Sequence, residues 1–260
     1  MSIKSPKVHS EILGTSEKKL LLLHGWGQSS QSLMPLGELL SHHYQVHLID
    51  LPGFGQSETP SDIWSSYDYA NCIQNYMQEQ NIAKATLIGH SFGGKVALSF
   101  AHSHPNQCEK LVLIASAGLQ AKATLRRSFR KIALRSLRFG VQTCDRICRT
   151  QVYKEWFTPR YASTDYLNAG EMRSILVRSV NEDLSSILPE IRCPSFILWG
   201  ADDLETPPEM AKRFAKQIPS AELLILEEKG HYLPLGISAH LCAFHLRNFL
   251  STHEEKCCHV

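Results

Sequence analysis

The chain has 260 residues, of which 43% are hydrophobic and 20% are charged, and this suits one large domain with a sizeable core. Its formal net charge of +2 is too small for a polycation that binds nucleic acid. The segment Met1–Leu13 is polar, and aliphatic runs such as Leu20–Leu23 are too short to span a bilayer. We therefore expect a cytoplasmic protein without an integral membrane segment. The eight cysteines match no extracellular disulfide framework and are expected to be reduced thiols.

Short aliphatic runs alternate with segments of helical spacing along most of the chain. Strands are expected at Leu20–Leu23, Gln45–Ile49, Ala85–Ile88, Lys110–Ile114, Ser195–Trp199 and Glu222–Leu226. Helices are expected at Leu33–His42, Tyr67–Gln80, Lys95–His102, Glu209–Lys216 and Ser238–Phe249, followed by a frayed tail from Ser251. This alternation predicts an α/β protein with a mostly parallel central sheet flanked by helices.

The alternation stops between the two halves of this pattern. From about Gln120 to Pro189 there are helical patterns and no convincing strand. The sequence thus predicts an α/β core domain formed by residues 1–119 and 190–260, interrupted by a helical cap insertion at residues 120–189.

The run Gly89-His90-Ser91-Phe92-Gly93-Gly94 lies between an expected strand and an expected helix. A G-x-S-x-G pattern in that context places a serine on a sharp strand-to-helix turn, where glycines leave room for the tight backbone. A serine hydroxyl becomes a useful nucleophile when it is held there and a base accepts its proton. Ser91 is therefore the candidate nucleophile.

Five segments in this order resemble the α/β-hydrolase fold family. They are His24-Gly25-Trp26-Gly27, Asp50-Leu51-Pro52-Gly53-Phe54-Gly55-Gln56-Ser57, the Ser91 turn, Trp199-Gly200-Ala201-Asp202-Asp203 and Gly230-His231. The resemblance covers nearly the whole chain outside the insertion, and it implies the α/β-hydrolase fold with a Ser–Asp–His catalytic triad. Ser91 at the turn disfavours the relatives of this fold that use an aspartate nucleophile.

By this resemblance His231 is the general base, and the acid is one of two neighbouring aspartates. The family spacing G-x-x-D after Gly200 favours Asp203, and Asp202 is then a turn residue. An oxyanion hole needs two backbone N–H groups. The resemblance assigns them to Phe92, which follows the nucleophile, and to Trp26, whose side chain is also expected to line the acyl pocket.

The stretch Lys122–Arg149 contains nine Lys or Arg residues and a single acid, Asp145, although the whole chain is nearly neutral. Its apolar residues fall near one helical face, so we expect a basic amphipathic helix in the cap. Two interpretations remain open. The helix is a solvated face paired with core acids, or it docks an anionic partner such as an acidic acyl carrier protein.

Two narrower resemblances differ about the substrate. The region from His24 to Ser57 is similar to pimeloyl-acyl-carrier-protein methyl ester esterases, although that family usually has tryptophan where this chain has His90. The segment Asp165–Leu184 instead resembles a broad bacterial hydrolase group of undefined substrate. No substrate-binding arginine is therefore carried over.

Together these patterns predict a serine hydrolase of the carboxylesterase type that acts on a small-molecule ester and needs neither a cofactor nor a metal. A C–C bond hydrolase of the meta-cleavage type would use the same triad. A hydrolase-like binding protein with little turnover is a third alternative.

Overall fold

The computed structural model describes residues 6–120, 137, 139–147, 150–157, 160 and 163–252. Within these residues, one sheet has the strand order β1-β3-β2-β4-β5-β6-β7. Its strands are β1 (Ser10–Leu13), β2 (Lys19–Leu23), β3 (Gln45–Ile49), β4 (Ala85–His90), β5 (Cys108–Ile114), β6 (Ser195–Gly200) and β7 (Ala221–Leu226). All neighbouring strands pair in parallel except β1, which is antiparallel to β3. The predicted α/β-hydrolase architecture is confirmed.

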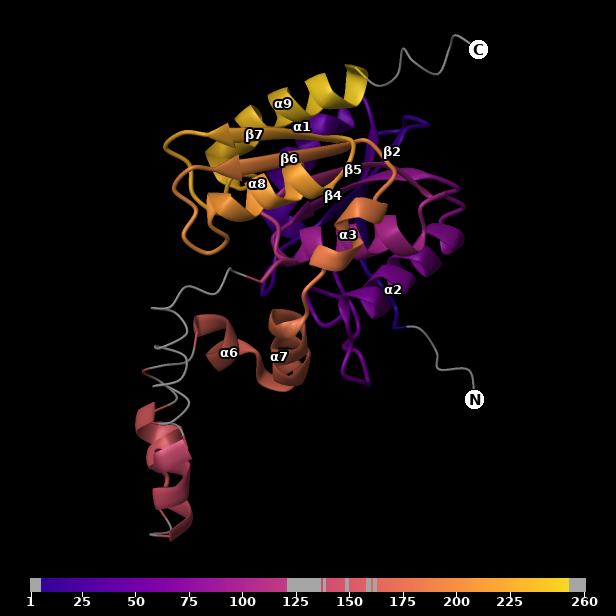
Figure 1. Ribbon diagram of the computed structural model, residues 1–260. Coiled ribbons are helices and arrows are strands. Elements are labelled where there is room, and N and C mark those ends of the chain that lie inside the picture. Colours follow the sequence, from indigo (N-terminus) through magenta and orange to yellow (C-terminus); the bar gives the residue numbers. More distant parts are fainter. Residues whose placement is uncertain are drawn as a thin grey trace.

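Helices cover both faces of the sheet (Figure 1). The α-helices are α1 (Met34–Ser41), α2 (Ser66–Glu79), α3 (Phe92–Ser103), α6 (Thr164–Asn168), α7 (Arg173–Asn181), α8 (Pro208–Gln217) and α9 (Ala239–Thr252). Shorter turns of helix are η1 (Ser30–Leu33), η2 (Tyr153–Phe157), η3 (Gly170–Met172), η4 (Ser185–Glu190) and η5 (Gly236–Ser238). Helices α1 and α9 pack on one face, and α2, α3 and α8 pack on the other.

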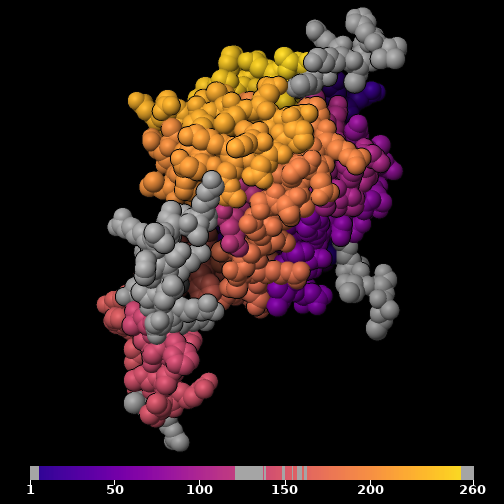
Figure 2. Space-filling view, in the orientation of Figure 1, coloured from indigo at the N-terminus to yellow at the C-terminus, as the bar shows by residue number. Residues whose placement is uncertain are grey.

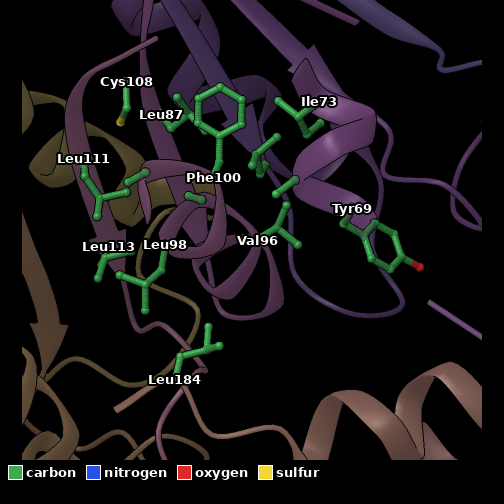
Figure 3. Close-up of a cluster of buried hydrophobic side chains, with 14 of the residues drawn as sticks. Tyr69, Ile73, Leu87, Val96, Leu98, Phe100, Cys108, Leu111, Leu113 and Leu184 are labelled. Atoms are coloured by element: carbon green, nitrogen blue, oxygen red, sulfur yellow. The ribbon is translucent and has the colours of Figure 1, made fainter. Parts of the chain in front are cut away.

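The parallel strands are buried on both faces, and each strand feeds two separate cores. In β2, Leu21 and Leu23 belong to the core under α2 and α3, whereas Leu20 and Leu22 belong to the core under α1 and α9. Successive side chains of a strand point to opposite faces, so a continuous run of leucines fills both cores. Figure 3 shows part of the first core, where Leu87, Ile73 and Phe100 gather.

Two details differ from the sequence prediction. The structure contains β1, which was not predicted because it is a short edge strand whose residues are mostly only half buried, so it has no aliphatic run. Helix α9 continues through Thr252, so the chain remains helical at Ser251, where fraying was expected.

The described part of the predicted insertion is helical and contains no strand, but its segments pack unequally. Helix α6 buries no residue, whereas α7 and η4 bury Ile175, Leu176, Ile187 and Leu188. The buried Lys95 ammonium of α3 donates to the carbonyls of Ser179 and Glu182 and lies 3.4 Å from the Glu182 carboxylate. Figure 2 shows the pink residues of the insertion projecting from the body of the molecule. The boundaries of a separate cap domain stay a prediction.

Most of the predicted basic helix, including residues 121–136, lies outside the described residues. In the described part of the chain, no helix is long and apolar enough to cross a bilayer. Among the described residues, the cysteines Cys72, Cys108, Cys193 and Cys242 are buried, and Cys144 is exposed.

Candidate active site

The carboxyl edge of the parallel sheet brings together the candidate residues. Ser91 directly follows β4, Asp203 lies in the loop after β6, and His231 lies in the loop after β7. Because these strands are parallel, their carboxyl ends meet at one edge, which is where ligands bind in open α/β sheets. Residues far apart in the sequence therefore face one another.

The turn at Ser91 has a backbone that only closely spaced glycines permit. Ser91 has φ 51° and ψ −113°, a conformation rarely adopted by residues with a side chain. A Cβ on Gly93 would lie 2.1 Å from the Leu23 carbonyl oxygen, and a Cβ on Gly89 would lie 2.4 Å from the Gly93 oxygen. The Ser91 amide donates to Ile114 O at 3.1 Å and thus ties the turn to β5. This packing holds the hydroxyl at the start of α3.

A continuous hydrogen-bond chain links the three predicted triad residues. The Ser91 Oγ lies 3.0 Å from His231 Nε2, and His231 Nδ1 lies 2.9 Å from Asp203 Oδ2. If Nδ1 carries the ring proton and donates to the carboxylate, Nε2 is free to accept the serine proton. His231 and Asp203 are buried, so water competes little for these contacts. The arrangement is that of a nucleophile, a base and an orienting acid.

The geometry separates the two neighbouring aspartates. Asp203 is 2% exposed, and its other carboxylate oxygen accepts the amides of Glu205 at 2.9 Å and Thr206 at 2.8 Å. Burial works to raise the Asp203 pKa, but the hydrogen bonds from His231 and Thr206 outweigh it and hold the pKa below its usual value. Asp202 is exposed and contributes its backbone to the loop, where its amide donates to Lys229 O at 2.9 Å.

The two predicted oxyanion donors lie beside the turn. Phe92 is the first residue of α3, and neither its amide nor that of Trp26 bonds to another group in the part of the chain that the structure describes. The rings of Trp26 and Phe92 contact edge to face, with centroids 5.3 Å apart. Both amides are thus free to bind a ligand oxygen.

A buried histidine fixes the backbone of the loop that carries Trp26. His24 Nε2 accepts the Leu51 amide at 3.0 Å, so Nδ1 carries the proton and donates to Gly25 O at 2.7 Å. Burial lowers the His24 pKa to about 4, which keeps the ring neutral. The nearby Asp50 carboxylate accepts the amides of Ser30 at 2.6 Å and Gln56 at 2.9 Å. Asp50 therefore holds loops together and does not reach the triad.

The sequence prediction used His90 only as a difference from one esterase family, yet the residue contacts the backbone of His231, the predicted base. It is 1% exposed, and its Nε2 donates to the backbone carbonyl of His231 at 3.0 Å. The two rings lie 5.1 Å apart, and burial lowers the His90 pKa to about 4. Its Nδ1 is the only buried side-chain nitrogen or oxygen in the described residues without a hydrogen-bond partner. The residue before the nucleophile thus anchors the His231 loop.

A cavity of about 390 Å³ opens beside the loop that carries Trp26. It is lined by Trp26, Gly27, Gln28, Gly53, Phe54, Asp165, Asn168, Ala169, Met172 and Tyr232. Trp26 thus lines a cavity, and the prediction that this cavity binds the acyl group stays a prediction. No sequence pattern selects Asp165 of α6, because only the tertiary structure brings that helix to the site.

The site has no metal-binding arrangement in the part of the chain described. No cluster of three or more His, Cys, Asp or Glu side chains there could hold a metal ion. The Cys257-Cys258-His259 run at the end of the chain lies outside the described residues.

Comparisons with known proteins agree with the fold of the chain. An uncharacterized hydrolase, YugF, of Bacillus subtilis is 27% identical over 86% of this chain and 89% of its own length. A 2-hydroxy-6-oxononadienedioate/2-hydroxy-6-oxononatrienedioate hydrolase of Cupriavidus pinatubonensis is 24% identical over 87% of this chain and 84% of its own. The crystal structure of an enol-lactonase from Burkholderia xenovorans superposes with a TM-score of 0.73 and 22% identity, covering 96% of this chain and 99% of that one. The alpha/beta hydrolase fold family model matches residues 18–236, and the chain therefore belongs to that family.

Proposed function

We propose that this hydrolase cleaves carboxylic esters, or related acyl compounds, through an acyl-enzyme on Ser91. The observation that carries the proposal is the chain of contacts from Ser91 Oγ through His231 to Asp203, at 3.0 and 2.9 Å. These contacts lie at the edge of the sheet beside the amides of Trp26 and Phe92, which bond to no other group among the described residues. This set of groups supplies a nucleophile, a base, an acid and an oxyanion site without a cofactor.

The first half of the reaction forms the acyl-enzyme. Ser91 Oγ attacks the ester carbonyl carbon while His231 Nε2 takes the hydroxyl proton, and the carbonyl electrons move onto the oxygen. The amides of Trp26 and Phe92 donate to that oxyanion. The intermediate then collapses as His231 gives its proton to the departing alcohol.

The second half repeats these steps with water. His231 removes a proton from a water molecule, which attacks the acyl carbon, and Ser91 leaves with the proton returned by His231. Throughout, Asp203 stays ionised and holds the imidazole in orientation. The lowered pKa of Asp203 suits this role, because the carboxylate stays charged at neutral pH.

The decisive experiment compares the wild-type enzyme with Ser91→Ala on short-chain 4-nitrophenyl esters. We expect the variant to lose at least about 10³-fold in kcat while its circular dichroism and melting temperature stay near those of the wild type. A fluorophosphonate probe should label Ser91 in the wild type and leave the variant unlabelled. Full ester turnover by Ser91→Ala would refute the assignment.

The second candidate is a C–C bond hydrolase of the meta-cleavage type, which the named Cupriavidus relative supports. Both chemistries use the same triad, so only substrates separate them. Purified enzyme assayed on a ring-cleavage dienoate beside the ester panel should show a clear preference for the esters. Higher kcat/KM on the dienoate would favour the C–C hydrolase.

A binding role with little turnover is the third candidate. It predicts slow or absent labelling of Ser91 by the fluorophosphonate despite an intact fold. The acyl carrier protein as partner and the cytoplasmic location both stay predictions. The basic residues Lys122 to Arg135 on which the carrier docking depends lie outside the described residues.

A further inference from the structure

A second carboxylate lies beside the proposed base. Glu205 Oε2 is 3.5 Å from His231 Nε2, the same ring nitrogen that faces Ser91 Oγ. The Tyr232 hydroxyl donates to Glu205 Oε1 at 2.8 Å, and the Glu205 amide donates to Asp203 Oδ1 at 2.9 Å. Both ends of the residue are thus held, and its charge faces the reacting atoms. The triad needs only one carboxylate, so Glu205 has no part in the mechanism above.

A third acid comes to the same place from the insertion. Asp165 of α6 lines the 390 Å³ cavity together with Tyr232, the residue that holds Glu205. Partial desolvation raises the Asp165 pKa although the residue is exposed, and the negative charge of Glu205 raises it further. The other polar side chains lining the cavity are neutral, and no Lys or Arg is among its lining residues in the described structure.

We propose that Glu205, assisted by Asp165, selects substrates by their charge. The enzyme then accepts uncharged or cationic esters and rejects esters that carry a carboxylate near the leaving alcohol. His231 Nε2 delivers its proton to that alcohol, so a group beside this nitrogen lies beside the leaving group. The inference rests on the proposed ester hydrolysis and names its substrate class.

Simple electrostatics gives the size of the effect. Two like unit charges about 6 Å apart near a protein surface repel strongly enough to change binding by about tenfold to a hundredfold. A cationic group gains a comparable attraction. A preference for uncharged or cationic substrates would also distinguish ester hydrolysis from C–C bond hydrolysis. The Cupriavidus relative is named for dioates, which carry two carboxylates. Such substrates would bring their negative charge to an acidic cavity with no cationic lining residue.

The test uses three butyrate esters that differ in the charge of the alcohol. They are butyrylcholine, its neutral isostere 3,3-dimethylbutyl butyrate, and 4-butyryloxybutanoate. Acid release in a pH-stat gives kcat/KM for each. We expect the wild type to prefer the cationic over the anionic ester by at least about tenfold, and Glu205→Gln to reduce this ratio by about tenfold or more. Asp165→Asn should reduce it by a smaller factor.

The matched control is Glu209→Gln, which removes an exposed acid from the first turn of α8 and should leave the ratio unchanged. Using the ratio cancels any effect of Glu205→Gln on the base itself, because that effect is common to all three esters. A wild-type ratio near one, or a ratio that Glu205→Gln does not alter, would overturn the proposal.

A second measurement separates this inference from ester hydrolysis itself. The rate of Ser91 phosphorylation is measured with a diethyl phosphorothiolate of thiocholine and with its uncharged 3,3-dimethylbutyl counterpart. We expect the cationic reagent to react at least about tenfold faster in the wild type, and the advantage to shrink in Glu205→Gln. If no ester is turned over but this preference holds, ester hydrolysis fails and the charge selection stands; equal labelling rates refute the charge selection.

Discussion

The carboxyl edge of the sheet and the insertion after β5 differ in how closely their residues pack. At the edge, Gly89 and Gly93 of the Ser91 turn have backbone atoms 2.4 and 2.1 Å from where a Cβ would stand. In the insertion, α6 buries no side chain, and a Cβ on Gly140 would meet nothing within 4 Å. Close backbone packing therefore fixes the proposed chemistry, while loosely packed side chains such as Asp165 can change without disturbing it.

The two regions also differ in their content of histidines, whose protonation changes between about pH 4 and pH 7. The insertion predicted at residues 120–189 contains no histidine, so all 13 histidines of the chain lie outside it. Two of these, His24 and His90, are buried and neutral behind the loops that carry Trp26 and His231. Protonation of His24 or His90 is thus expected to destabilise the edge, and the insertion lacks histidines of this kind.

The largest expected effect concerns the acid of the triad. Asp203→Asn should lower kcat by about 10⁴-fold on 4-nitrophenyl esters, because an amide cannot stabilise the charged imidazole and favours the wrong tautomer. Asp202→Asn is the matched control and should change kcat less than about threefold, since its side chain is exposed. Steady-state kinetics of both variants gives the comparison; an equal loss in both would show that the loop as a whole, and not Asp203, is required.

The next effect contrasts a glycine of the edge with one of the insertion. A methyl group on Gly93 would meet the carbonyl oxygens of Leu23 and His24, and backbone atoms cannot move away as flexible side chains do. We expect Gly93→Ala to lower the free energy of unfolding by about 3 kcal/mol or more. Gly140→Ala, in the helical residues 139–147, should change it by less than about 1 kcal/mol. Urea denaturation measures both, and equal losses would contradict the comparison.

The smallest of the three effects is an acid-dependent loss of stability. An unfolded histidine binds a proton near pH 6.5, whereas His24 and His90 have a pKa of about 4 in the folded protein because they are buried. Between these values the unfolded state binds more protons, so stability is fully present above pH 6.5 and falls as the pH drops toward 4. Each histidine accounts for about 3 kcal/mol at most.

The loss of stability on acidification is measured by urea denaturation at pH 7 and pH 4.5. His90→Gln retains a side-chain donor for the His231 carbonyl but does not titrate, so it should lose less stability on acidification than the wild type. Parallel pH profiles for the two proteins would show that His90 does not set the acid sensitivity.

Local sequence was sufficient to predict the strands that precede the site residues. The leucines of β2 and the aliphatic runs of β4 and β6 are long enough to be recognised, and buried parallel strands need such runs. The edge strand β1 could not be predicted in this way, because a half-exposed strand has no such aliphatic run. The Ser91 turn was recognisable because its backbone tolerates few residues besides glycine at fixed spacing.

The sequence by itself determined the family and, from the glycines of a sharp turn, the nucleophile candidate Ser91. The preference for Asp203 over Asp202 came from the spacing and chain order of the family that the sequence resembles. Only the tertiary structure brought Glu205 to His231 Nε2, Asp165 to the cavity that Trp26 and Tyr232 line, and His90 to the His231 carbonyl. These contacts join loops and a helix that are distant along the chain, and no local pattern specifies such distances. The periodicity of the sequence therefore does not predict the positions of Glu205 and Asp165, the residues that we propose to select the substrate.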